Sequence, residues 1–330
     1  MRQHYDIYAI VYTPQEVHFG HEKQINLNVV ETVKVAKNSG DDYDLKLYFS
    51  PTKRRGVERR SVLWMPVGDE YYYKMVECCI PQTCCSCILC DVFGGLDNRV
   101  RNISITSRVT QGGGVAVQPL PPEIKQRLVV SADLKRKIER AGEGEGEDTS
   151  ATPFKKEYAE PGIWFPITTH CTSLTKEEFG LVAYGFLDAM RRYSAGHPKG
   201  GWIVNGEVNG EERPLIVVDT YRAPQVNRPL VAPTTNDTET ALDQFQRGIP
   251  IDGSWGNIEI IHKESCGSKL FTRYYGEAAL KFLEENSANF VNHIGSIIQK
   301  MFREEVVAAL KQVRKDLGII EEVEQNGEGN

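Results

Sequence analysis

The sequence predicts an α+β protein built around a mostly antiparallel β-sheet. Three observations lead to this prediction: strand-like segments gather in the first part of the chain, an amphipathic helix begins at Thr175, and a glycine-rich turn with another strand follows it. Strands that come in runs, rather than in regular alternation with helices, are typical of a sheet with its helices gathered on one side. From residue 279 onwards apolar residues recur at helical spacing, so the C-terminal part is expected to be helical.

The expected strands have the composition of buried β-structure. Residues 5–13 are rich in β-branched and aromatic side chains and stop at Pro14. Residues 25–35 and 45–49 follow, separated by a polar turn at 38–42. Later in the chain the expected strands are 162–171, 202–204 and 215–218.

The helix that begins at Thr175 is marked at both ends. Thr175 and Glu178 form a capping-box pattern, in which each side chain bonds the backbone N–H of the other residue. Gly196 is expected to end the helix. The expected apolar face consists of Phe179, Val182, Phe186 and Met190.

We expect a single domain over residues 1–330 with an insertion at 108–160. Three consecutive glycines open this segment, and its Gly/Glu-rich part, 141–152, is expected to be a flexible loop. Irregular insertions of this length are typically functional or disordered. The acidic residues 321–330 are expected to form a disordered tail.

The net charge of -6 leaves a nucleic-acid partner open, because a binding face needs only a local positive field. Much of the acid lies in residues 143–148 and in the tail. No segment approaches the roughly 20 consecutive apolar residues of a membrane helix. The first residues lack the apolar core of a secretory signal. We therefore expect a cytoplasmic protein that does not enter the membrane.

The densest cluster of cations lies in residues 51–60. Lysine and arginine can neutralise backbone phosphates and release counterions, so the run is a candidate RNA-binding segment. The alternative interpretation is a solvated loop. The candidate residues are Lys53, Arg54, Arg55, Arg59 and Arg60.

Six of the eight cysteines lie between Cys78 and Cys90, and crowding of this kind indicates a metal site. Zinc prefers four thiolate or imidazole ligands, and a two-residue gap allows a tight turn to present two sulfurs. The expected ligands are Cys79, Cys84, Cys87 and Cys90, with Cys78 or a distant histidine as alternatives for the fourth. The competing interpretation is a group of reduced thiols packed near a turn.

Residues 87–94, Cys-Ile-Leu-Cys-Asp-Val-Phe-Gly, resemble the Cys-Pro-x-Cys-x-x-Phe-Gly segment of CRISPR-associated RAMP backbone subunits. In that family, as here, a strand and an Arg-bearing stretch follow; here the stretch ends at Arg108. The helix from Thr175, the glycine turn and the strand to Val204 are similar to the family's second β-α-β half. The chain departs from the family in its short Lys199-Gly200-Gly201 loop. The layout is most like the subunit of type IV complexes, with type I-D second.

The resemblance implies an RRM-like (ferredoxin-like) sheet core with inserted thumb and finger elements. It implies a subunit that polymerises along a crRNA guide, in a helical filament of its own copies with other CRISPR effector subunits, and presents the guide to target DNA or RNA. Such a protein should hold the RNA backbone and leave the bases free to pair. The further RNA-binding residues implied are Ser107, Arg108, Gln111, Gly112, Gly113, Gly114, His197, Lys199, Gly200 and Gly201.

Two other functions stay open beside this non-catalytic one. One is an RNA endonuclease of the type III kind, in which a loop aspartate acts; Asp41, Asp42 and Asp97 are the candidates, although aspartate also favours ordinary turns. The other is a zinc-stabilised general RNA-binding protein. We expect no catalysis.

Overall fold

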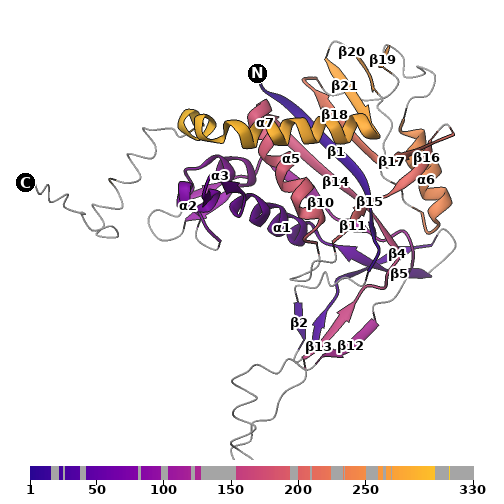
Figure 1. The fold of residues 1–330 in the computed structure, drawn as a ribbon. Helices are drawn as coiled ribbons and strands as arrows, with labels where there is room; N and C mark the ends of the chain where they lie inside the picture. Colours follow the sequence, from indigo (N-terminus) through magenta and orange to yellow (C-terminus); the bar gives the residue numbers. More distant parts are fainter. Residues whose placement is uncertain are drawn as a thin grey trace, which may run out of the picture.

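A sheet of antiparallel strands forms the centre of the computed structural model (Figure 1). Its strands follow the spatial order β10-β14-β1-β18-β21-β20-β19, and β15 pairs with β1 beside this path. The strands are β1 (Gln3–Thr13), β10 (Val109–Gly112), β14 (Ile163–Leu174), β15 (Trp202–Ile203), β18 (Ile216–Tyr221), β19 (Glu259–His262), β20 (Ser265–Ser268) and β21 (Phe271–Tyr275). The expected α+β class with a mostly antiparallel sheet is confirmed.

The structure describes the greater part of the chain. The described residues are 1–15, 22–24, 27–37, 42–80, 83–97, 103–119, 123–127, 154–193, 200–208, 210–223, 233, 235–249, 259–262, 265–268, 270–301 and 312. The expected flexible loop 141–152 and the expected tail 321–330 lie outside them. Within the described part of the chain, no helix has both the length and the apolar character needed to cross a membrane.

Helices α1 (Pro51–Leu63), α5 (Lys176–Met190) and α7 (Glu277–Met301) cover one face of the sheet (Figure 1). Side chains alternate between the two faces of a strand, and on β1 Tyr5, Ile7 and Val11 point toward these helices. They share one hydrophobic core with Phe179 of α5 and Leu283 of α7. Tyr5 stacks on Phe179 with ring centroids 3.9 Å apart.

The capping box predicted at Thr175 is confirmed. The Thr175 side chain accepts a hydrogen bond from the backbone N–H of Glu178, and the Glu178 carboxylate accepts one from the backbone N–H of Thr175. The predicted apolar face of α5 is buried, as expected. The helix ends at Met190, before the predicted stop.

With the smaller elements set aside, the chain order of the main elements is β1-α1-β10-β14-α5-β18. In space the four strands lie in the order β10-β14-β1-β18. The first strand of the chain therefore lies between two strands that come much later.

Helix α6 (Thr238–Arg247) and the hairpin of β16 (Asn205–Val208) and β17 (Glu211–Pro214) lie at the opposite face of the sheet. A second apolar cluster forms there, and it joins Tyr8 and Ile10 of β1 to Phe245 of α6. The sheet is thus covered on both faces near its centre.

Two small sheets extend the molecule beyond the main one. One contains β4 (Thr32–Ala36), β5 (Tyr43–Phe49) and β11 (Gly114–Val115). The other contains β2 (Glu22–Gln24), β3 (Leu27–Val29), β12 (Glu123–Arg127) and β13 (Phe154–Tyr158), and it projects from one end of the body (Figure 1). The expected insertion 108–160 thus begins inside the main sheet with β10, and only its later part contributes to the projecting sheet.

The basic run 51–60 lies in α1, so the alternative expectation of a solvated loop is wrong. Ser50 is the N-cap and accepts from the backbone N–H of Lys53, and Pro51 occupies the first turn. Beyond α1 the chain forms short elements around the cysteines. These are β6 (Pro66–Val67), β7 (Glu70–Tyr71), α2 (Tyr72–Val76), α3 (Ile88–Phe93), β8 (Gly95–Asp97) and β9 (Ile103–Ile105).

Candidate metal centre and nucleic-acid interface

Four buried cysteine side chains converge next to α1. The Sγ atoms of Cys78, Cys84, Cys87 and Cys90 all lie within 4.8 Å of one another. The Sγ atom of Cys90 is 3.5 Å from that of Cys78 and 3.9 Å from that of Cys84. A tetrahedral site with Zn–S bonds of about 2.3 Å places its sulfurs about 3.8 Å apart. The donor set and its spacing therefore fit a structural zinc ion.

Two residues with left-handed backbone turn the chain at this cluster. Glu77, with φ 47°, ends α2 directly before Cys78, and Cys85, with φ 52°, directly follows Cys84. Cys87 is the N-cap of α3, and Cys90 lies in its first turn. Left-handed backbone is costly for a non-glycine residue and persists where the surrounding structure requires it. Here it directs sulfurs from separate segments to one point.

The fourth member of the cluster is Cys78, which corrects the expectation of Cys79. Cys78 is buried within the cluster, whereas Cys79 is exposed. Glu77 turns the chain with left-handed backbone directly before Cys78, and no spacing rule reports that conformation. The sequence alone therefore left both open.

Arg59 connects the cysteine cluster with α1. Its Nη2 atom donates to Sγ of Cys90 at 3.4 Å, and its Nη1 atom donates to the carbonyl oxygen of Gly94 at 2.7 Å. The hydrogen bond with Cys78, followed by those with Cys87 and Cys90, holds the pKa of the Cys84 thiol well below its usual range. A buried guanidinium beside the thiols offsets part of the negative charge that thiolates would bring.

Arg54 is buried in the centre of the fold and is not available to RNA. Its Nη1 atom donates to the carbonyl oxygens of Gly112 at 2.7 Å and Thr168 at 2.5 Å, and its Nη2 atom pairs with Glu58 at 3.0 Å. Arg59 is also buried. The structure thus removes these two arginines from the expected RNA-binding set, because their guanidinium groups are used to join α1 to the sheet and to the cysteine cluster.

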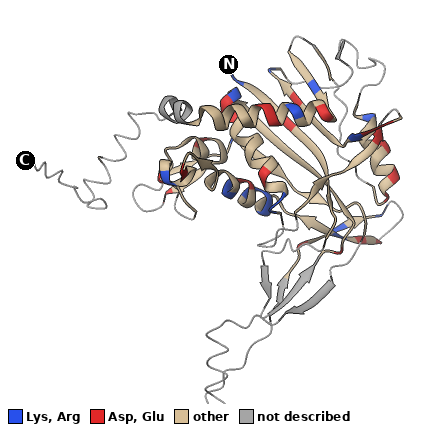
Figure 2. Cartoon of the chain, in the orientation of Figure 1, with Lys and Arg blue, Asp and Glu red and all other residues tan. Residues whose placement is uncertain are grey.

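The other cations of the run remain at the surface. Lys53 is half-buried, and Arg55 and Arg60 are exposed. Arg55 donates to the carbonyl oxygen of Phe93. Within the described part of the chain none of the three forms an ion pair. Burial, followed by the charge of Arg60, lowers the pKa of Lys53. The positive charges of Lys53 and Arg60 therefore repel each other. Figure 2 shows Lys and Arg gathered along α1.

Ser107 and Arg108 are half-buried and bond to other parts of the protein. Arg108 Nη2 lies 2.5 Å from an Asp91 carboxylate oxygen and 2.8 Å from one of Glu178. Ser107 donates to the carbonyl oxygen of Val109 at 2.6 Å. Arg108 therefore joins β10 to α3 and α5. The sequence pattern around Arg108 did not predict this structural role.

Other parts of the protein pack closely against the glycines at 112–114. A Cβ atom on Gly112 would lie 2.0 Å from Oγ1 of Thr168, and one on Gly113 would lie 2.1 Å from the Tyr48 hydroxyl. Gly114 is buried, as is Gln111, whose amide donates to Glu58 at 3.0 Å. Close approach of other side chains explains these glycines without RNA.

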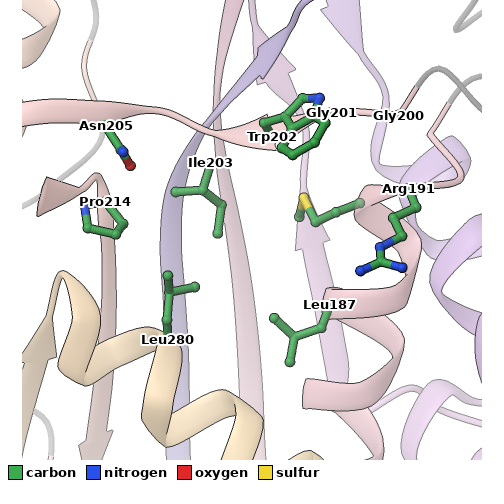
Figure 3. Close-up of a pocket in the computed structure, with 10 residues that line it drawn as sticks. Leu187, Arg191, Gly200, Gly201, Trp202, Ile203, Asn205, Pro214 and Leu280 are labelled. Atoms are coloured by element: carbon green, nitrogen blue, oxygen red, sulfur yellow. The ribbon is translucent and has the colours of Figure 1, made fainter.

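Gly200 and Gly201 border a pocket of about 580 Å³ between the end of α5, β15 and α7 (Figure 3). Gly200 has φ +56°, and Gly201 donates its backbone N–H to the carbonyl oxygen of Met190 at 2.7 Å. Trp202, 66% exposed, and Arg191 also line the pocket. The expected site residues His197 and Lys199 lie outside the described residues.

The candidate loop aspartates have ordinary environments where the structure describes them. Asp42 pairs with Lys37 at 2.8 Å, and this hydrogen bond lowers the pKa of the Asp42 carboxyl. Asp97 is buried at the end of β8, and Asp41 lies outside the described residues.

A buried polar network at Glu58 was not predicted. Besides Arg54, the Glu58 carboxylate accepts from the amide of Gln111 and from the Tyr193 hydroxyl at 2.8 Å. The Arg54–Glu58 spacing of four residues in a helix is the only sequence signal that could have indicated it.

No protein-family model matches the chain, and no curated protein matches it. Solved structures are similar to it. Csc2 from Thermofilum pendens is 16% identical with a TM-score of 0.36, over 67% of this chain and 66% of Csc2. A chain of a CRISPR RNA-guided surveillance complex is 11% identical with a TM-score of 0.38, over 73% of this chain and 80% of that one. A chain of such a complex before nicking is 10% identical with a TM-score of 0.39, over 76% and 89%. All three TM-scores lie below 0.5, so the likeness is partial.

Proposed function

We propose that this chain is a non-catalytic, cytoplasmic backbone subunit that coats a CRISPR guide RNA. Copies of it would assemble side by side along the guide, together with other effector subunits, and hold the guide for pairing with target DNA or RNA. The proposal rests first on the resemblance of residues 87–94 to the RAMP backbone subunits, with the type IV subunit as the first candidate and the type I-D subunit as the second.

The observation that carries the proposal is that some cations of α1 are buried and hold the helix in place, while the others lie at the surface. Arg54 and Arg59 fix the helix to the sheet and to the cysteine cluster from inside. Lys53, Arg55 and Arg60 stay at the surface without ion pairs among the described residues. A rigid element that carries uncompensated positive charge suits a protein that must hold RNA by its phosphates without reading the base sequence.

The arrangement of the main sheet supports an RRM-like core. The chain order β1-α1-β10-β14-α5-β18 is a β-α-β-β-α-β order, and β1 lies between β14 and β18. The projecting sheet that contains β12 and β13 supports an inserted thumb. Both features agree with what the resemblance implies.

We further propose that zinc is bound by Cys78, Cys84, Cys87 and Cys90. A bound zinc would link the short segments that carry these cysteines and would fix the N-terminal end of α3, where Arg59 contacts Cys90. Four protein ligands leave no open coordination position, which is typical of a structural site and not of a catalytic one.

The test is to purify the protein from its native host and to sequence the RNA that accompanies it. Short RNAs with shared repeat-derived ends and variable interiors are the expected result. RNA of heterogeneous sequence would contradict guide coating and would favour the second candidate, a zinc-stabilised general RNA-binding protein, whose zinc site the buried cysteine cluster supports. Copurified protein that cleaves target RNA, and no longer does so after replacement of Asp41 and Asp42 by alanine, would contradict the non-catalytic proposal.

A further inference from the structure

Two exposed aromatic side chains and a half-buried one, Tyr73, form a cluster where α1 ends. Trp64 is 52% exposed and Tyr71 is 42% exposed. The ring centroid of Trp64 lies 5.3 Å from that of Tyr71 and 5.0 Å from that of Tyr73, and the two tyrosines stack at 5.9 Å. Large aromatic side chains gathered at a surface indicate a contact with another molecule.

The aromatic cluster continues the cationic face of α1. Residues three or four apart share one side of a helix, so Lys53, Gly56, Arg60 and Trp64 form one stripe over about 16 Å of helix. A Cβ atom on Gly56 would lie 3.4 Å from a guanidinium nitrogen of Arg60, so Arg60 lies along the helix over Gly56, toward Lys53. The stripe therefore changes from positive charge at one end to aromatic rings at the other.

We propose that this stripe binds single-stranded RNA, with phosphates at Lys53 and Arg60 and a base stacked on the cluster of Trp64, Tyr71 and Tyr73. The proposal rests on the RNA-binding function proposed above and adds a contact to a base. A base stacked on an aromatic ring is held without regard to its identity, because every base has a π-face. Stacking at this point is thus compatible with a protein that binds guides of any sequence.

Charge favours RNA over a protein partner at this surface. Within the described residues, Lys53 and Arg60 have no acidic partner, so both charges are available to phosphates. Lys74 lies 5.9 Å from the centroid of Tyr71 and adds a cation at the aromatic end, although Glu70 pairs with it at 2.9 Å. A polyanion with flat bases matches both ends of the stripe.

The test compares binding of a single-stranded uridine oligonucleotide with binding of an abasic phosphodiester strand of equal length. Trp64→Leu and Tyr71→Leu should each weaken binding of the uridine strand, Trp64→Leu by about tenfold or more, and leave binding of the abasic strand unchanged. Trp64→Phe should keep most of the affinity. The control is Tyr43→Leu, because Tyr43 is 48% exposed and lies under Lys34 at 4.5 Å, far along the chain from this cluster. It should change neither affinity.

Wild-type protein that binds the uridine strand with the same affinity as both leucine variants would overturn this inference and leave the proposed function standing. An equal loss on the abasic strand would show that no base is contacted, and would overturn it too. Variants with a changed oligomeric mass in the absence of RNA, and an unchanged RNA affinity, would assign the cluster to a protein contact instead. Wild-type protein that binds neither strand would overturn the proposed function together with this inference.

Discussion

Glu58 neutralises a positive charge that has no contact with water. Both Glu58 and Arg54 have side-chain exposures of 0%, and Glu58 also accepts from Gln111 and Tyr193. Removal of one member of a buried ion pair leaves the other charge buried and uncompensated, at a cost of about 3–5 kcal/mol. We expect Glu58→Ala to lower the free energy of unfolding by that amount, as measured by urea denaturation.

The control for Glu58 is Glu70, which pairs with Lys74 at the same spacing of four residues but at the surface. An exposed pair of this kind contributes little to stability, because solvent screens its charges, so Glu70→Ala should leave the free energy of unfolding nearly unchanged. Equal losses of stability for Glu58→Ala and Glu70→Ala would contradict the assignment of Glu58 to the core.

Two adjacent cysteines provide a sharp test of the zinc site. Cys78→Ser removes a member of the buried cluster, so we expect loss of bound zinc and a lower Tm. Cys79→Ser changes an exposed thiol next to it and should leave both quantities unchanged. Metal analysis of protein purified without chelator measures the zinc content, and an equal zinc content in the two variants would argue against the ligand set.

At the scale of elements, Glu178 joins three of them at the N-terminus of α5. Its carboxylate pairs with Arg108 of the segment before β10 and with Arg2 ahead of β1, and it accepts from the backbone of Thr175. Burial raises the pKa of Glu178, but these partners, Arg108 foremost, outweigh burial and lower it overall. A lowered pKa means that the stabilisation is present above the unfolded value of about 4.3 and is lost as the pH falls through the folded value.

We therefore expect the wild type to lose more stability than Glu178→Gln between about pH 5 and pH 3. Urea denaturation midpoints across that range measure the difference. Parallel curves for the two proteins would show that Glu178 does not couple folding to protons.

Helix α1 should determine how strongly RNA binding depends on salt. Each phosphate contact to a single strand contributes about 0.7 to the slope of log K against log salt. We expect the double variant Lys53→Gln/Arg60→Gln to weaken RNA binding and to reduce this slope by about 1.4. Arg247→Gln is the control, since Arg247 is an exposed arginine on α6 that pairs with Asp243. A double variant with the wild-type slope would exclude α1 from the RNA path.

The elements show where sequence reasoning succeeds. The start of α5 was predictable because the Thr175–Glu178 capping box is a local interaction. The helical conformation of α1 was not predicted, because the segment was interpreted by its charge alone. Ser50 and Pro51 are an N-cap and a first-turn proline, and this pair marks a helix start. The burial of Arg54 depends on carbonyl groups at 112 and 168, and pattern within α1 does not report such distant partners.

The same limit applies to the candidate site. Three of the four cysteines in the cluster were predictable from their spacing, which is local. The glycines at 112–114 look like a loop that approaches RNA, but Thr168 and Tyr48 occupy the space that side chains at 112 and 113 would need. Only the folded arrangement of distant segments distinguishes these two reasons for a glycine.

For the whole molecule, coating of a guide predicts that the number of bound chains rises with RNA length. Contacts to phosphates are available along the whole of any strand, so longer RNAs should recruit more copies in steps of one chain. Mass photometry on RNAs of increasing length measures these steps. A fixed stoichiometry on all lengths would contradict polymerisation and would favour a subunit that binds one end or one structure of the RNA.

The position of β1 in the sheet has a consequence for biosynthesis. β1 is synthesised before its partners β14 and β18, with Ile7 opposite Thr169 and Val218. At about 5–20 residues per second, roughly 10–40 s pass between the synthesis of β1 and that of β18. During this interval β1 has two unpaired edges, which other chains can pair with. The nascent chain should therefore depend on chaperones until residue 221 has emerged.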